Sequence, residues 1–113
     1  MRKRVWLSYD LSLNGDYEGL FRWLDEEDAE ECGDGLAVFV FNFESDDSSD
    51  AVEANELLES IKRSMSINEK RDRIYAVWRR NSGKTAGRFL VGNRKRAPWE
   101  GAAGRESEDE DDS

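Results

Sequence analysis

Apolar and polar residues alternate from Val5 to Leu11, and the spacing of the apolar residues then changes. Alternation at every second position predicts a β-strand with one buried face. From Tyr17 the apolar residues recur at intervals of three and four, which predicts an amphipathic helix that runs to about Glu31. Gly33 and Gly35 are predicted to end this helix.

The strongest strand signal is the segment Leu36–Phe43, which is apolar except for Asn42. A strand that is apolar on both faces is typical of the centre of a covered sheet. A second helix is predicted to begin at Asp50, because Glu53 follows three residues later as in a capping box. Its buried positions lie between Ala54 and Met65.

Two further strands, Arg73–Arg79 and Gly87–Gly92, are predicted to pair as a hairpin. The predicted order is therefore β-α-β-α-β-β, within one α/β domain over residues 1–100. Helical connections favour parallel neighbours, so we expect a four-stranded mixed sheet with two helices.

The pattern leaves two arrangements of these helices open. If both cover the same face of the sheet, the other face of the central strand is apolar and exposed, and a homodimer would cover it. If one helix lies on each face, no dimer is needed.

Composition fits a small domain followed by an acidic tail. Of the 113 residues 37% are hydrophobic, and 4 Trp, 3 Tyr and 5 Phe can fill one core. Residues 101–113 are mostly small or acidic, which predicts a disordered tail. The longest apolar run, Leu36–Phe41, is too short to cross a membrane, so we expect a cytoplasmic protein with no membrane partner.

The net charge of −9 is unevenly distributed along the chain. Residues 10–59 hold 17 acidic residues and one basic residue, whereas residues 62–96 hold 12 Lys and Arg and two acidic residues. The basic segment is predicted to meet an anion such as nucleic acid, or alternatively to be neutralised by the acidic helices. The acidic tail either aids solubility or folds back on the basic segment.

Composition also excludes several kinds of catalytic site. The chain has no His and one cysteine, Cys32, which leaves no histidine-based nucleophile and no structural zinc site. Ser82–Thr85 match the end of a P-loop motif, but Trp78 stands where the motif needs a glycine. We therefore expect no P-loop.

Carboxylates that follow predicted strands are the candidate metal ligands. Asp10 follows the first strand and Glu44 follows the second. The carboxyl ends of parallel strands meet at one edge of a sheet, so Asp10 and Glu44 are predicted to bind Mg²⁺ for phosphodiester hydrolysis. The alternative is that both are solvated loop residues.

The segment from the third strand to the exit loop combines cations with aromatic rings. Cations bind phosphates and aromatic rings stack on unpaired bases, which predicts a nucleic-acid surface. Alternatively, Phe89 belongs to the core and Trp99 packs the chain end onto the domain. The predicted nucleic-acid-binding residues are Arg79, Arg80, Arg88, Arg94, Lys95, Arg96 and Trp99.

The pair Tyr9–Asp10 at the end of the first strand resembles the small CRISPR-adaptation endonuclease family. The resemblance implies a ferredoxin-like variant of the fold, a homodimer, and Asp10 as a metal ligand. The basic run that the family carries after this Asp is replaced here by residues 11–15.

Two functions are therefore predicted. The first is a small nucleic-acid-associated protein, which with Mg²⁺ at Asp10 would be a metal-dependent nuclease. The second is a non-enzymatic protein–protein interaction module, such as a small regulator or inhibitor related to phage proteins, which the absence of His favours.

Overall fold

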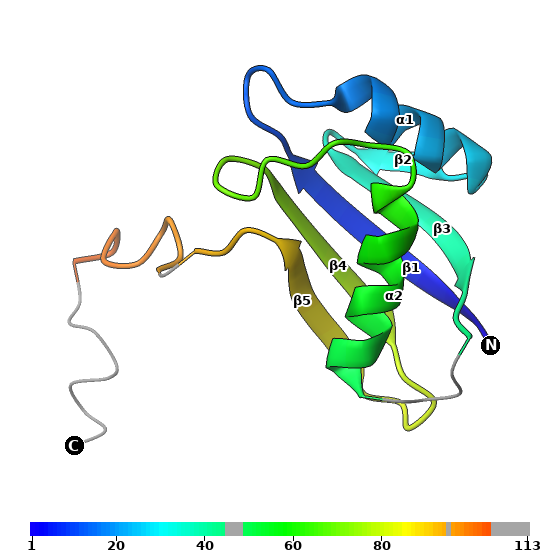
Figure 1. Cartoon of the computed structure of the whole chain (residues 1–113). Coiled ribbons are helices and arrows are strands. Elements are labelled where there is room, and N and C mark those ends of the chain that lie inside the picture. Colours follow the sequence, from blue (N-terminus) through cyan, green and yellow to red (C-terminus); the bar gives the residue numbers. More distant parts are fainter. Residues whose placement is uncertain (45–48, 95, 105–113) are drawn as a thin grey trace.

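The computed structural model describes residues 1–44, 49–94 and 96–104 (Figure 1). Most of the predicted acidic tail therefore lies outside the described residues. Within them, no helix is long and apolar enough to cross a bilayer. The elements in this part of the chain are β1 (Arg2–Asp10), α1 (Tyr17–Glu26), β2 (Glu30–Gly33), β3 (Leu36–Asn42), α2 (Asp50–Lys62), β4 (Arg73–Arg79) and β5 (Thr85–Val91).

The strands form one sheet in the order β2-β3-β1-β4-β5, and every neighbouring pair is antiparallel. The α/β class and the two helices are confirmed, whereas the expectation of a four-stranded mixed sheet was wrong. The helical connections do join parallel strands, since α1 leads from β1 to β2 and α2 leads from β3 to β4. Another strand lies between the two members of each parallel pair, so no parallel strands are neighbours.

The strand that the pattern missed is β2. The first helix ends at Glu26 rather than near Glu31, and Asp28 takes a left-handed backbone with φ of 57° that turns the chain back. Glu30 and Glu31 then pair with β3. All four residues of β2 are exposed, so this edge strand has no apolar alternation to reveal it.

The second helix begins as predicted but is capped differently. The Ser49 hydroxyl, rather than Asp50, accepts the Val52 N–H at 3.2 Å. Glu53 makes no capping box because its side chain is fully buried. Its carboxylate accepts hydrogen bonds from Lys3 Nζ at 2.7 Å and from the Trp78 indole at 2.8 Å, and it therefore ties α2 to the sheet.

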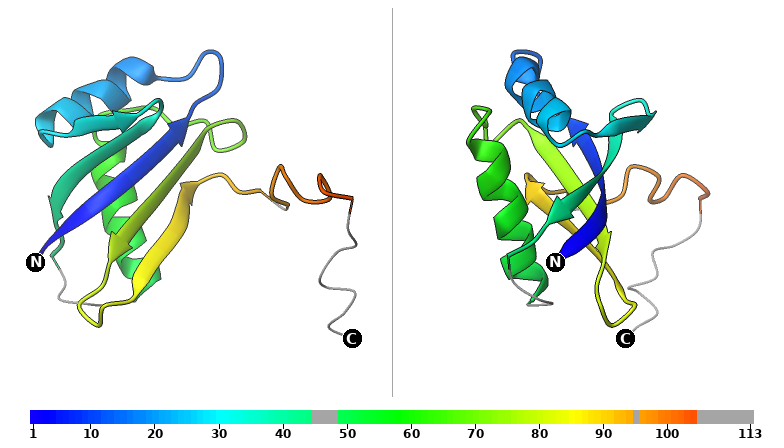
Figure 2. Two further views of the ribbon diagram at one scale, coloured as in Figure 1. Left: turned by 180° about the vertical axis from the view of Figure 1, so that it is seen from behind. Right: turned by 90° about the vertical axis from the view of Figure 1, so that its right-hand side faces the viewer.

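Both helices lie on the same side of the sheet, and the other side is left open (Figure 2). The hydrophobic core fills the space between the helices and the sheet. Along β1 and β4, residues that point into this core alternate with residues that point to the other side of the sheet. The first of the two arrangements that the sequence left open is therefore the observed one. The largest fully buried apolar side chains are Trp78, Phe43, Leu7, Leu20, Leu57, Ile61, Ile74 and Val5.

Candidate functional site

We call the uncovered side of the sheet the open face. Successive side chains of a strand point to opposite sides of the sheet, so the residues of the open face alternate along each strand with the residues that point into the core. The open-face residues are Glu30 of β2, Leu36, Val38, Val40 and Asn42 of β3, Arg2, Arg4, Trp6, Ser8 and Asp10 of β1, Arg73, Tyr75, Val77 and Arg79 of β4, and Thr85 and Phe89 of β5.

An apolar strip crosses the middle of the open face. Trp6 is 38% exposed and lies in register with Val38 on one side and Val77 on the other. The Tyr75 and Phe89 rings pack edge to face nearby, with centroids 4.9 Å apart. A contiguous exposed apolar patch rimmed by polar residues commonly marks a binding surface.

Cations surround this strip. Arg2, Arg4, Arg73 and Arg79 project from the open face, and Arg94 follows β5 beside it. Within the part of the chain that the structure describes, none of these five guanidinium groups forms an ion pair. The described open face carries two carboxylates, Asp10 and Glu30, so its net charge is positive.

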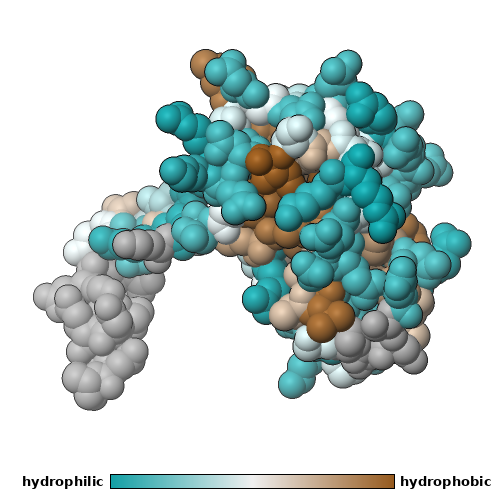
Figure 3. Space-filling view, in the orientation of Figure 1, coloured by the Kyte–Doolittle hydropathy of each residue, from teal (hydrophilic) through white to brown (hydrophobic). Residues whose placement is uncertain are grey.

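The helix side has the opposite charge. The α1 residues carry three carboxylates against one arginine, and the α2 residues carry four against one lysine. Figure 3 views this side and shows a mostly hydrophilic surface. The helices are therefore acidic and the open face is basic, whereas Arg80 and Arg88 of the basic segment do not lie on the open face.

The predicted nucleic-acid residues do not all fall on the open face. Arg79 projects from it, and Arg94, Arg96 and Trp99 line a hollow at its end. Arg96 also binds Glu100 through Nε at 2.9 Å.

The remaining three lie elsewhere. Arg80 pairs with Asp50 of α2 at 2.6 Å, and Arg88 is in register with Ala76 on the helix side. Lys95 lies outside the described residues.

The predicted metal ligands are not brought together within one chain. Because β1 and β3 are antiparallel, Arg2 pairs with Asn42, and Glu44 follows at the end of the sheet opposite to Asp10. The expectation that both lie at one edge assumed parallel strands. Among the described residues, no group of three or more Asp, Glu or Cys side chains is placed to hold a metal ion.

A hollow of about 610 Å³ lies between the end of the open face and the segment that follows β5. The right-hand view of Figure 2 shows this segment leaving the sheet on the side away from the helices. Asp10, Arg73 and Tyr75 line the hollow from the sheet, and Arg94 and Trp99 line it from the segment. The Trp99 ring is 75% exposed.

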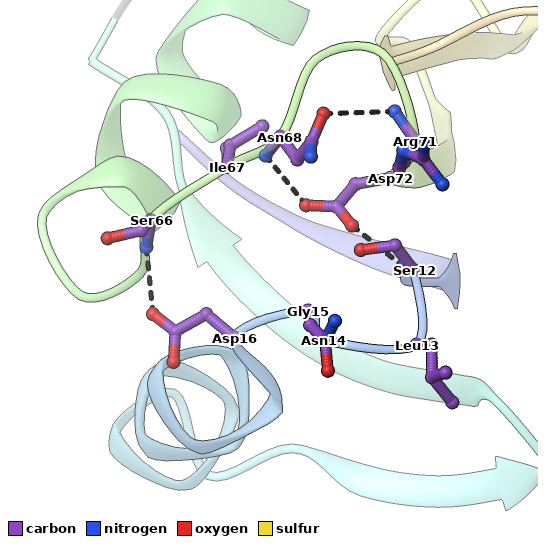
Figure 4. A pocket seen from close by; sticks show the side chains of 10 residues that line it. All are labelled: Ser12, Leu13, Asn14, Gly15, Asp16, Ser66, Ile67, Asn68, Arg71 and Asp72. Carbon is purple, nitrogen blue, oxygen red and sulfur yellow. Dashed lines mark hydrogen bonds between the residues drawn. The ribbon is translucent and has the colours of Figure 1, made fainter.

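A second hollow, of about 540 Å³, lies among the loops that precede α1 and follow α2 (Figure 4). Its carboxylates are already engaged by the backbone. The buried Asp72 accepts the N–H groups of Ser12 at 2.9 Å and Asn68 at 2.8 Å. Asp16 accepts the Ser66 N–H at 2.8 Å and caps α1, and these backbone donors lower the pKa of Asp16. These side chains hold the two loops together.

Sequence reasoning missed Arg2, Arg4, Trp6 and Tyr75 as site residues. The signal was present, since the first three stand at every second position, opposite to the apolar residues of the same strand.

Comparisons with known proteins give no match among family models, curated proteins or solved structures.

Proposed function

We propose that this protein binds nucleic acid across the open face. The observation that carries the proposal is a set of arginines without ion-pair partners in the described part of the chain, arranged around exposed aromatic rings. Such cations bind phosphates by releasing condensed counterions. Their grouping on the side opposite to the acidic helices also orients a polyanion during encounter.

The aromatic strip favours an unpaired strand over a duplex. Trp6 and Phe89 are 38% and 36% exposed, so each ring offers area on which an unpaired base can stack. The first six elements follow the β-α-β-β-α-β order of ferredoxin-like folds, which leave one sheet face free for a ligand.

Salt dependence of binding to a fluorescein-labelled single-stranded DNA tests the proposal. We expect the logarithm of the association constant to fall linearly with the logarithm of the salt concentration, by about 0.7 for each phosphate neutralised. Arg4→Ala should reduce that slope by about 0.7, because it removes one phosphate contact. Lys70→Ala removes an exposed cation from the loop after α2 and should leave the slope unchanged. A flat salt response of the unaltered protein would overturn the proposal.

A nuclease form of this function adds Mg²⁺ at Asp10, as the resemblance implies. A single carboxylate supplies part of an octahedral ligand set, and water, the nucleic acid or a second copy would complete it. Mg²⁺-dependent cleavage of a labelled strand that Asp10→Ala abolishes, with the fold retained by circular dichroism, is the expected result of this form.

A second candidate is a protein interface, including a homodimer through the open face. Trp6 with its neighbours Val38 and Val77 favours it, since an apolar patch of this kind commonly marks protein contacts. Light scattering over a range of protein concentrations tests the homodimer, and Trp6→Glu should shift the mass toward the monomer. Competition by a labelled DNA strand would show whether the two uses share the face.

A further inference from the structure

We propose that the hollow at the end of the open face binds one unpaired guanine nucleotide of the bound strand. The inference rests on the proposed function and adds a base preference to it. In this proposal the Asp10 carboxylate accepts hydrogen bonds from the Watson–Crick edge of the guanine base.

The size and the walls of the hollow suit a nucleotide. Its volume of about 610 Å³ lies within the range of small-ligand pockets. Tyr75 and Phe89 line it from the sheet, and Pro98 and Trp99 line it from the segment that follows β5. A flat ring placed between aromatic side chains buries both of its faces, which is how unpaired bases are held. The Trp99 ring is 75% exposed without such an occupant.

A glycine lets the Tyr75 ring lie down on the sheet. A Cβ atom at Gly87 would meet the Tyr75 hydroxyl at 2.7 Å and two ring carbons at 3.4 and 3.5 Å. The ring therefore extends over β5 at the position where any other residue would project its side chain. Tyr75 also lines the hollow.

Asp10 gives the hollow its selectivity. Its carboxylate is exposed, lines the hollow, and has no hydrogen-bond or ion-pair partner in the described part of the chain. An ionised carboxylate accepts hydrogen bonds and donates none. Guanine presents two adjacent N–H donors on its Watson–Crick edge, whereas each of the other bases places an acceptor beside its donor. Two parallel charge-assisted hydrogen bonds therefore favour guanine.

The phosphate of the same nucleotide is within the reach of arginines. Arg73 lines the hollow from β4 and Arg94 lines it from the segment after β5, and neither forms an ion pair among the described residues. The guanidinium fork matches phosphate oxygens in pairs. The hollow thus offers aromatic rings to the base and arginine side chains to the phosphate of the same nucleotide.

The experiment compares short thymidine oligonucleotides in which one central base is guanine, adenine, cytosine or thymine. Fluorescence anisotropy is measured in EDTA, so that no bound divalent metal contributes. We expect the guanine oligonucleotide to bind about tenfold more tightly than the all-thymine one. Asp10→Asn should abolish this preference, while the affinity for the all-thymine oligonucleotide stays equal or rises because one negative charge is lost.

Two matched variants control this result. Glu30→Gln removes the other described carboxylate of the open face, outside the hollow, and should keep the guanine preference. Trp99→Ala should weaken binding of all four oligonucleotides by about tenfold. Leu13→Ala truncates another exposed apolar side chain, 97% exposed, and should change nothing.

The possible failures are distinguishable. Salt-dependent binding with equal affinity for the four bases would overturn the guanine pocket and leave the proposed function standing. A preference that Asp10→Asn retains would also overturn it. Absence of salt-dependent binding to every oligonucleotide would overturn both proposals.

Discussion

The strand β1 places cations on both sides of the sheet, and these cations differ in burial and in ion pairing. Lys3 points to the helix side, where its ammonium is buried and lies 2.7 Å from the Glu53 carboxylate. Arg2 and Arg4, one position before and after it, point to the open face and have no ion-pair partner in the described part of the chain. A buried charge requires a partner inside the fold, whereas an exposed one is free to take a partner from outside.

The largest effect should come from breaking the buried pair. Glu53→Ala leaves the Lys3 ammonium and the Trp78 indole without their shared acceptor, so the free energy of unfolding should fall by about 3–5 kcal/mol. Urea unfolding measures this loss. Arg4→Ala should change the same quantity by less than about 0.5 kcal/mol. An equal fall in the free energy of unfolding for the two variants would show that cations on the two sides of the sheet contribute alike to stability.

A double variant sharpens this first prediction. Lys3→Met with Glu53→Gln removes both buried charges and keeps an oxygen for the Trp78 indole. We expect it to be more stable than Glu53→Ala, because it removes the buried Lys3 ammonium together with its Glu53 partner.

On the open face, charge reversal should affect binding and spare stability. Arg4→Glu with Arg79→Glu places two carboxylates in the path proposed for the phosphates, and affinity for single-stranded DNA should fall more than tenfold. Lys70→Glu with Arg71→Glu makes the same change in net charge on the loop after α2. If the second pair weakens binding as much as the first, net charge rather than the open face determines affinity.

A smaller effect is expected at Gly87. Gly87→Ala should displace the Tyr75 ring and weaken binding about threefold, while the free energy of unfolding changes by less than about 1 kcal/mol. Adding Tyr75→Phe removes the hydroxyl that the new methyl group meets at 2.7 Å. Recovery of affinity in this double variant, measured by anisotropy, would show that the ring position is responsible.

The smallest effect concerns acid stability. Backbone N–H groups of Ser66 and Gly19 lower the pKa of Asp16 from 3.8, so this carboxylate stabilises the fold above its unfolded-state pKa. That contribution is lost as the pH falls through the lowered native pKa. Asp16→Ala should therefore lower Tm at neutral pH and lose less Tm on acidification than the unaltered protein.

Local pattern predicted most elements because their periodicity is local. The Arg73–Arg79 strand agrees residue for residue, and the strong apolar run became β3, Leu36–Asn42. The polar edge strand β2 carries no such signal, because its four side chains are all exposed. Strand neighbours depend on contacts between distant segments, so the sheet was wrongly expected to be mixed.

The same limit explains the candidate site. Arg79, Arg94 and Trp99 were predicted from one cationic segment, and the structure places them on or beside the open face. Arg4 and Trp6 come from the other end of the chain and reach that face only through the register of β1 with its two neighbours.

Interleaving of the strands also has a consequence for biosynthesis. β1 precedes both of its neighbours in the chain, and the second of them, β4, ends only at Arg79. During translation the central strand therefore emerges from the ribosome long before both of its edges can pair. Such late, long-range pairing slows folding and leaves both edges of the central strand unpaired in the meantime.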